Sequence, residues 1–364
     1  MRLDMSQKQG VIVMSAILPT TGHIDLIRFA VSHADLSGMK KFTVIVNTRP
    51  HEPGFLSRGG WIRNSLELCG LYANHPSIDV KVINDCDADA FQNPGDVEYE
   101  PDFWDFWANK VETFAPGGNH VVYASEQYGE KLALALGGDF VPYDIARSLN
   151  YVQGTATRRN LPYTWANVAI GARQTLAKRV TIFGQESVGK TTMVAQLKAM
   201  SPSSYTTLHE FARPYLESVG PDLTYEKMKN ILYGQAAIQI ASMQDAKSPA
   251  IVMDTDVLST FGYCVLKGYH RLLDEADNMS SMLMADLYVV MPDDIPFEVD
   301  PLRFGGDKRE SSTEFWIELL EDVGANYIVV PRGISQVEKL LFVHKAIQEL
   351  ISSTLNPFIE FTRD

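Results

Sequence analysis

The stretch IFGQESVGKTT, residues 182–192, decides the fold of the second half of this chain. Gly184, Gly189, Lys190 and Thr191 match the full phosphate-loop pattern G-x-x-x-x-G-K-[ST]. Glycines let the backbone curl so that its N–H groups point at phosphate oxygens, and the following helix adds its positive N-terminal end. The pattern predicts an ATP site, with Lys190 at the β- and γ-phosphates and the Thr191 hydroxyl on Mg²⁺.

Strands alternate with helices on both sides of this loop. The apolar run RVTIFG is a strand that leads into the loop, and KTTMVAQLKAM is the helix that follows it. The same order begins earlier, with the strand GVIVMSAI at residues 10–17 and the helix TGHIDLIRFAVSHAD. This alternation predicts two doubly wound, parallel-sheet α/β domains, a Rossmann-like one over residues 1–175 and a P-loop one over residues 176–364.

Other charged residues of the second half follow predicted strands or lie in polar loops. Asp254 and Asp256 end the strand AIVMDTD, where a carboxylate can hold Mg²⁺ or take a substrate proton. Glu210 and Arg213 lie in LHEFAR, after another strand, where a carboxylate can contact an acceptor hydroxyl. The general base stays open between Glu210 and Asp254, and the segment DPLRFGGDKR resembles a lid that carries Arg303 toward the transferred phosphate.

A second nucleotide site is indicated near the beginning of the chain. The segment LPTTGHIDLI places Thr20, Gly22 and His23 between the first strand and its helix, with the T-x-G-H spacing of nucleotidylyltransferases. Gly22 allows a nucleotide to approach closely, and His23 can stabilise charge that grows on an α-phosphate. Such chemistry needs positioning and electrostatics and no covalent nucleophile.

Two further segments support this first site. In VQGTATRRN, residues 152–160, Thr155 and Arg158 resemble the [ST]-x-x-R end of nucleotidylyltransferase domains, where ATP phosphates are held. Trp104 and Trp107 are spaced by three, so they share one helix face. Their indoles can stack on a cationic pyridinium or pack in the core.

Composition excludes several classes of function. The formal net charge is -13 and the pI is about 5.1, which disfavours binding to nucleic acid or anionic membranes. The N-terminal segment MRLDMSQKQG is polar and lacks the apolar core of a signal peptide, so no signal peptide is expected. No apolar run approaches the roughly 18 residues of a membrane span. The three cysteines form no metal or disulfide pattern. A cytoplasmic protein is expected.

Taken together, these motifs resemble the NadR family, whose members join a nicotinamide mononucleotide (NMN) adenylyltransferase to a ribosylnicotinamide kinase in that order. The resemblance covers roughly residues 10–350. Its most specific signs are the order of the two halves and the loop pattern G-x-E-S-x-G-K, which includes Glu186 and Ser187. Thr20 and His209 stand where the family usually has a histidine and an aromatic residue.

The resemblance implies that the chain makes NAD in two steps, with ATP as co-substrate and Mg²⁺ as cofactor. The kinase half phosphorylates nicotinamide riboside to NMN, and the first half transfers AMP from ATP to NMN and releases pyrophosphate. The residues implied in the first half are His23, Thr20, Gly22, Thr155, Arg158, Trp104 and Trp107. Those implied in the second are Gly184, Glu186, Ser187, Gly189, Lys190, Thr191, Thr192, Glu210, Arg213, Asp254, Asp256 and Arg303.

The sequence leaves two alternative functions open. The first is another nucleotidylyltransferase, such as one acting on phosphopantetheine, fused to a nucleoside kinase. The second is a nucleotide-sensing regulator that binds without turnover. Only about ten residues precede the first strand, so the DNA-binding segment of some NadR proteins is not expected. The sequence leaves open whether the chain forms a homo-oligomer, whether NAD inhibits it and whether NMN passes directly between sites.

Overall fold

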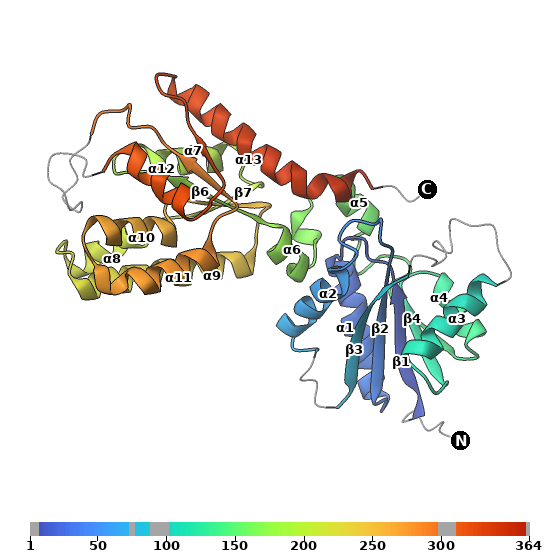
Figure 1. Cartoon of the computed structure of the whole chain (residues 1–364). Coiled ribbons are helices and arrows are strands. Elements are labelled where there is room, and N and C mark those ends of the chain that lie inside the picture. Colours follow the sequence, from blue (N-terminus) through green and yellow to red (C-terminus); the bar gives the residue numbers. More distant parts are fainter. Residues whose placement is uncertain (1–6, 73–76, 88–101, 298–310, 362–364) are drawn as a thin grey trace. The chain divides into compact units, whose positions relative to one another are not determined.

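The computed structural model describes residues 7–72, 77–87, 102–297 and 311–361. The chain forms two compact units, and the last residues of the chain return to the first of them. Unit 1 is Met1–Thr175 with Asn356–Asp364, and unit 2 is Leu176–Leu355. Each unit contains one five-stranded parallel sheet with helices on both faces, which confirms the predicted fold class (Figure 1).

The sheet of unit 1 has the strand order β3-β2-β1-β4-β5, with every pair parallel. The order reverses between β1 and β4, and such a switch point is where doubly wound sheets bind nucleotides. The strands are β1 (Gln9–Met14), β2 (Lys41–Thr48), β3 (Asp79–Cys86), β4 (His120–Ala124) and β5 (Asp139–Pro142). The helices are α1 (Thr21–Leu36), α2 (Arg58–Leu68), α3 (Phe103–Phe114), α4 (Tyr128–Ala135), α5 (Gly154–Arg159) and α6 (Ile170–Leu176).

The two faces of this sheet carry separate apolar clusters. On one face, α1 and α2 bury residues such as Ile27 and Ile62 against Ile12 and Val44. On the other face, α3 and α4 pack against β1 and β4. The central strands β1 and β2 are almost continuously buried, because a parallel sheet is covered on both sides. Their carboxyl ends are therefore fixed rigidly relative to one another.

Unit 2 has the strand order β10-β9-β6-β8-β7, again all parallel, so the phosphate-loop strand β6 is central. The strands are β6 (Lys178–Phe183), β7 (Tyr205–Leu208), β8 (Ala250–Met253), β9 (Leu287–Val290) and β10 (Tyr327–Val329). The helices are α7 (Lys190–Met200), α8 (Ala212–Val219), α9 (Tyr225–Asp245), α10 (Val257–Leu266), α11 (Leu273–Leu283), α12 (Thr313–Asp322) and α13 (Gln336–Ile359).

Helices cover unit 2 in two groups. The helices α10 and α12 bury Leu258 and Trp316 against β8 and β9. On the other face, α7 and α13 lie together and are joined by a hydrogen bond from Gln336 to Gln196 (Figure 1). Within the described part of the chain, no helix combines the length and the hydrophobicity that crossing a bilayer requires.

The end of α13 belongs to unit 1 and packs there against two of its segments. The Phe358 ring lies 6.0 Å from the Trp61 ring of α2, measured between centroids. The Arg158 guanidinium donates a hydrogen bond of 2.9 Å to the Phe361 carbonyl, and the Phe361 ring lies beside it. These contacts make the last residues a structural part of the first unit.

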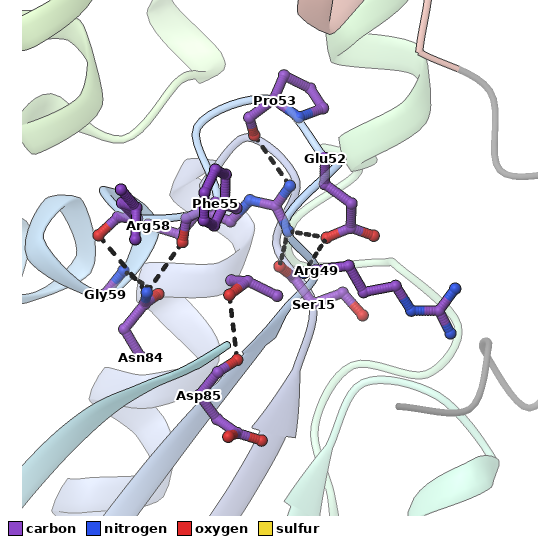
Figure 2. A network of polar contacts seen from close by, with 11 residues as sticks. Ser15, Arg49, Glu52, Pro53, Phe55, Arg58, Gly59, Asn84 and Asp85 are labelled. Atoms are coloured by element: carbon purple, nitrogen blue, oxygen red, sulfur yellow. Dashed lines mark hydrogen bonds and ion pairs between the residues drawn. The ribbon is translucent and has the colours of Figure 1, made fainter. Parts of the chain in front are cut away.

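A buried ion pair connects the loops at the carboxyl ends of β1 and β2 (Figure 2). Arg58, the first residue of α2, is 0% exposed, and its Nη1 lies 2.6 Å from Oε2 of Glu52. The same guanidinium donates to the carbonyls of Ser15 and Pro53 at 3.2 and 2.9 Å. Glu52 also accepts from the Arg49 backbone N–H. The pair thus holds the β1–α1 loop and the β2–α2 loop together.

Replacing Arg58 with methionine is expected to lower the free energy of unfolding by about 3–5 kcal/mol, because a buried carboxylate loses its partner. Urea denaturation of the full chain measures this loss. The double variant Glu52→Met/Arg58→Met should lose less than the sum of the two single variants, since it leaves no unpaired charge. Additive losses would show that the two side chains are not coupled.

Candidate functional sites

The phosphate loop of unit 2 runs from Gly184 to Gly189, between β6 and α7. Gly184, Ser187 and Gly189 have φ angles of +125°, +57° and +84°, so the backbone curls through conformations that glycine adopts most readily. Lys190, the first residue of α7, donates from Nζ to the carbonyls of Gly184 and Gln185 at 2.8 and 2.7 Å. The loop therefore has the shape and the cation that a phosphate chain requires.

The neighbouring strand brings a carboxylate to the same loop. β8 pairs with β6, with Met253 opposite Thr181, so the residue after β8 lies beside the loop. That residue is Asp254, and its Oδ2 accepts a 2.7 Å hydrogen bond from the Thr191 hydroxyl. Hydroxyl and carboxylate oxygens are ligands that Mg²⁺ accepts, with its other positions filled by water and phosphate. Thr191 and Asp254 therefore fit a magnesium ion.

These groups open into a cavity of about 400 Å³. On one side it is lined by the phosphate loop, and on another by apolar side chains of α8 and α9 such as Leu216, Met228 and Ile231. A pocket with a few polar groups against an apolar wall suits a small polar molecule with an aromatic part. The predicted site residues that line it are Glu186, Ser187, Gly189, Lys190, Thr191, Thr192, Glu210, Arg213 and Asp254.

Three of the residues predicted for this site are not among those that line the cavity. Gly184 begins the loop and is not among the lining residues, and Arg303 falls outside the described residues. Asp256 is buried and caps α10, because its Oδ1 accepts from the Ser259 N–H at 2.8 Å. Its Oδ2 accepts from the Thr181 hydroxyl at 3.1 Å, and burial raises the pKa of this carboxyl. This geometry gives Asp256 a structural role.

Sequence patterns missed several residues that line the cavity. Thr260, Tyr263 and Lys267 come from α10 and its end, and Gln235 comes from the middle of α9. In the sequence they interrupt apolar helical patterns without forming a motif. Gln235 is the one residue of this group that the sequence could have revealed, because it is a polar residue on an apolar helix face. His209 is exposed and is not among the lining residues.

In unit 1, the structure joins the two segments that the sequence assigned to one site. The His23 ring lies beside the first residue of α5, since a Cβ on Gly154 would be 3.6 Å from His23 Cε1. A Cβ on Gly22 would lie 3.2 Å from the Val152 carbonyl oxygen, so glycine allows the loops to approach. The segments LPTTGH and VQGTATR therefore meet at the carboxyl end of β1.

The His23 ring has a defined orientation. Its Nδ1 lies 3.0 Å from the Thr20 backbone N and 2.7 Å from the Thr20 hydroxyl. Because the backbone N–H donates to Nδ1, the proton of the neutral ring sits on Nε2. Burial, and then the positive charge of Arg147, lower the pKa of His23 to about 4. His23 is thus a neutral donor at neutral pH, and Arg147 is a basic residue near this site that no motif revealed.

An NMR titration of the full chain should give His23 a midpoint near pH 4, well below the ordinary value of 6.5. Between about pH 4 and pH 6.5, the unfolded state then binds more protons than the folded state. Stability contributed by neutral His23 is therefore lost as the pH falls from about 6.5 toward 4. A midpoint at or above 6.5 would contradict the placement of the ring.

The remaining predicted residues of this site differ in accessibility. Thr155 is exposed in α5, whereas Arg158 is buried and engaged by the Phe361 carbonyl. Binding of ATP phosphates by Arg158 stays a prediction. Trp104 and Trp107 are both buried in the cluster under α3, which favours packing, and stacking on a base stays a prediction.

The comparisons with known proteins agree with this arrangement. The model of a family described as AAA domain matches residues 179–336. The NadR protein of Escherichia coli K12, named a trifunctional NAD biosynthesis/regulator protein, is 27% identical over 263 residues, which cover 66% of this chain and 60% of that protein. The NadR protein of Salmonella typhimurium LT2 is 27% identical over 259 residues, with the same coverage. The chain thus spans about 60% of the length of these relatives.

Two solved structures are similar in fold over most of the chain. A NadR protein in complex with NR has a TM-score of 0.58 at 19% identity and covers 95% of this chain and 96% of its own. A NadR protein in complex with NAD and AMP-PNP has a TM-score of 0.57 at 20% identity, and the match covers 98% of this chain and 97% of that protein. The chain is therefore similar to NadR proteins in sequence and in fold, which confirms the resemblance that its motifs indicated.

Proposed function

We propose that this chain is a bifunctional enzyme that makes NAD from nicotinamide riboside in two ATP-dependent steps. Unit 2 phosphorylates the riboside to NMN, and unit 1 transfers AMP from a second ATP to NMN. The observation that carries this proposal is the contact between Thr191 and Asp254 at the phosphate loop, beside a cavity that also contains Glu210. The NadR relatives, whose names include NAD biosynthesis, support the choice of substrates.

In unit 2, the phosphate loop and Lys190 bind the β- and γ-phosphates of ATP. Thr191 and Asp254 would hold Mg²⁺, which when bound would neutralise charge on the transferred phosphoryl group. Since Asp254 faces Thr191, we assign the riboside 5′-hydroxyl to Glu210, which accepts its proton as the oxygen attacks the γ-phosphorus. ADP leaves with the bridging oxygen, and Arg303 is proposed to stabilise the charge in transfer.

In unit 1, an oxygen of the NMN phosphate attacks the α-phosphorus of ATP, and pyrophosphate leaves. His23 donates from Nε2–H to the α-phosphate as negative charge grows there. Thr20 orients the ring through Nδ1, and the nearby Arg147 adds positive charge. Thr155 and Arg158 are proposed to bind the β- and γ-phosphates, and Trp104 to contact the nicotinamide.

The test is an incubation of the full chain with nicotinamide riboside, ATP and Mg²⁺, with a parallel reaction started from NMN. Chromatography that resolves riboside, NMN and NAD should show NAD from both reactions. NAD from NMN alone would overturn the kinase assignment. NMN that accumulates without NAD would overturn the adenylyltransferase assignment.

A further inference from the structure

A buried glutamine bridges the two strand ends that carry the candidate acidic residues of unit 2. Gln235 lies in the middle of α9, is 1% exposed and lines the cavity. Its Nε2 donates a 2.8 Å hydrogen bond to the Thr255 carbonyl. Its Oε1 accepts a 3.0 Å hydrogen bond from the Phe211 backbone N–H. One planar amide therefore contacts two backbone segments at once.

Each of these backbone partners directly follows a candidate functional residue. Phe211 follows Glu210 after β7, and Thr255 follows Asp254 after β8. β7 and β8 are neighbouring strands, and the pairing between them extends to the bond from Asp254 N to the Leu208 carbonyl. Beyond that bond the two backbones diverge into α8 and α10. Beyond this point, the two hydrogen bonds of the Gln235 amide connect the backbones in place of strand pairing.

The donor and the acceptor of the amide explain why a glutamine occupies this position. A buried backbone N–H and a buried carbonyl both need a partner, and the amide is a side chain that offers an acceptor and a donor in one plane. An apolar side chain would leave both backbone groups unsatisfied, and the two strand ends would be free to separate.

Gln239, one helical turn further along α9, provides an internal comparison. It is 0% exposed and also bridges two segments. Its Nε2 donates to the Leu283 carbonyl at 2.9 Å, and its Oε1 accepts from the Val257 N–H at 3.3 Å. It therefore joins the start of α10 to the end of α11. Gln239 is not a lining residue of the cavity.

We propose that Gln235 is a positioning residue for phosphoryl transfer, which sets the separation between Glu210 and Asp254. This inference rests on the proposed kinase function of unit 2. Displacement of a reacting group by about 1 Å can lower a rate about 100-fold. The amide fixes the residue that follows each carboxylate, so its loss should affect the geometry of the metal and of the acceptor hydroxyl together.

The experiment compares Gln235→Met with Gln239→Met in the full chain. Methionine has a similar length and offers neither hydrogen bond, so both variants lose a buried amide from the same helix. We expect Gln235→Met to lower kcat for riboside phosphorylation about 30- to 100-fold. Its KM for ATP should change by less than about threefold, and it should need more Mg²⁺ for half-maximal activity. Gln239→Met should keep kcat within about threefold of the wild type, although its Tm also falls.

The outcomes separate a positioning role from a structural one. Equal losses of kcat in both variants, or a fall in Tm alone for Gln235→Met, would overturn the proposal. Adenylyl transfer from ATP to NMN should be unchanged in both variants, because that reaction belongs to unit 1. A loss of adenylyl transfer in Gln235→Met as large as its loss of riboside phosphorylation would also overturn the positioning role, because the substitution would then disturb the whole chain.

A second readout separates this inference from the proposed function. If the wild type does not phosphorylate the riboside, the proposed kinase activity fails, and binding of AMP-PNP is then measured by calorimetry over a range of Mg²⁺ concentrations. We expect Gln235→Met to require several-fold more Mg²⁺ than the wild type or Gln239→Met, because Asp254 is displaced from Thr191. The same Mg²⁺ dependence in all three proteins would overturn the positioning role.

Discussion

Lys190→Met is expected to lower riboside phosphorylation about 100-fold or more and to leave adenylyl transfer to NMN unchanged. The Lys190 ammonium contacts the carbonyls of Gly184 and Gln185, so it is held at the phosphate loop before any phosphate binds. A cation placed where charge develops contributes roughly 100- to 1,000-fold to a rate, and methionine keeps the length without the charge. Steady-state kinetics from the riboside and from NMN measure the two reactions separately.

Lys345→Met is a suitable control for this variant. Lys345 is in α13, its side chain is 78% exposed, and its charged neighbour is Glu349 one turn away. The control should keep both activities, because it removes a lysine that faces solvent in the same unit. Loss of both activities in Lys190→Met would show that the two units do not act independently.

His23→Asn and His23→Gln are expected to separate the two functions of the His23 ring. Asparagine can keep the acceptor that faces the Thr20 N–H but has no group at the position of Nε2. It should lower adenylyl transfer about 100-fold or more, with little change in Tm. Glutamine can place a donor near the position of Nε2 but loses the contact with Thr20. It should retain more activity and lose about 1 kcal/mol of stability.

The measurement is the rate of NAD formation from NMN and ATP, with Tm recorded for each variant. His33→Asn is the control in the same helix, because asparagine can keep the contact that His33 Nδ1 makes with the Tyr123 hydroxyl. Riboside phosphorylation should be unchanged in all three proteins. An active His23→Asn variant would contradict the role of Nε2 in adenylyl transfer.

The fold was predictable from the sequence because the patterns that indicate its strands and helices are local. Apolar runs for buried strands and amphipathic runs for helices alternate along the chain, and this order permits few topologies. The loop at residues 184–189 was recognisable because a tight phosphate cradle requires glycines at fixed spacing. The contact between Thr191 and Asp254 follows from the pairing of β6 and β8, which only the structure revealed.

The parts that the sequence did not reveal depend on contacts between distant segments. Asp254 and Asp256 are two residues apart and chemically alike, yet one faces Thr191 and the other caps α10. Local sequence cannot separate these roles, because the start of a helix and the direction of a side chain are set by packing. Gln235 makes its bonds to segments 20 and 24 residues away. Its function therefore could not be read from any local motif.

The return of α13 to unit 1 also has a consequence for how the chain is made. A ribosome synthesises residues 176–355 before residues 356–361, so the contacts of Arg158 and Trp61 with the end of the chain form last. All of unit 2 is therefore synthesised before the last segment of unit 1, whereas an N-terminal domain is usually complete, and folds, before the domain that follows it. A chain that ended at Leu355 would contain all of unit 2 and would lack the segment that completes unit 1.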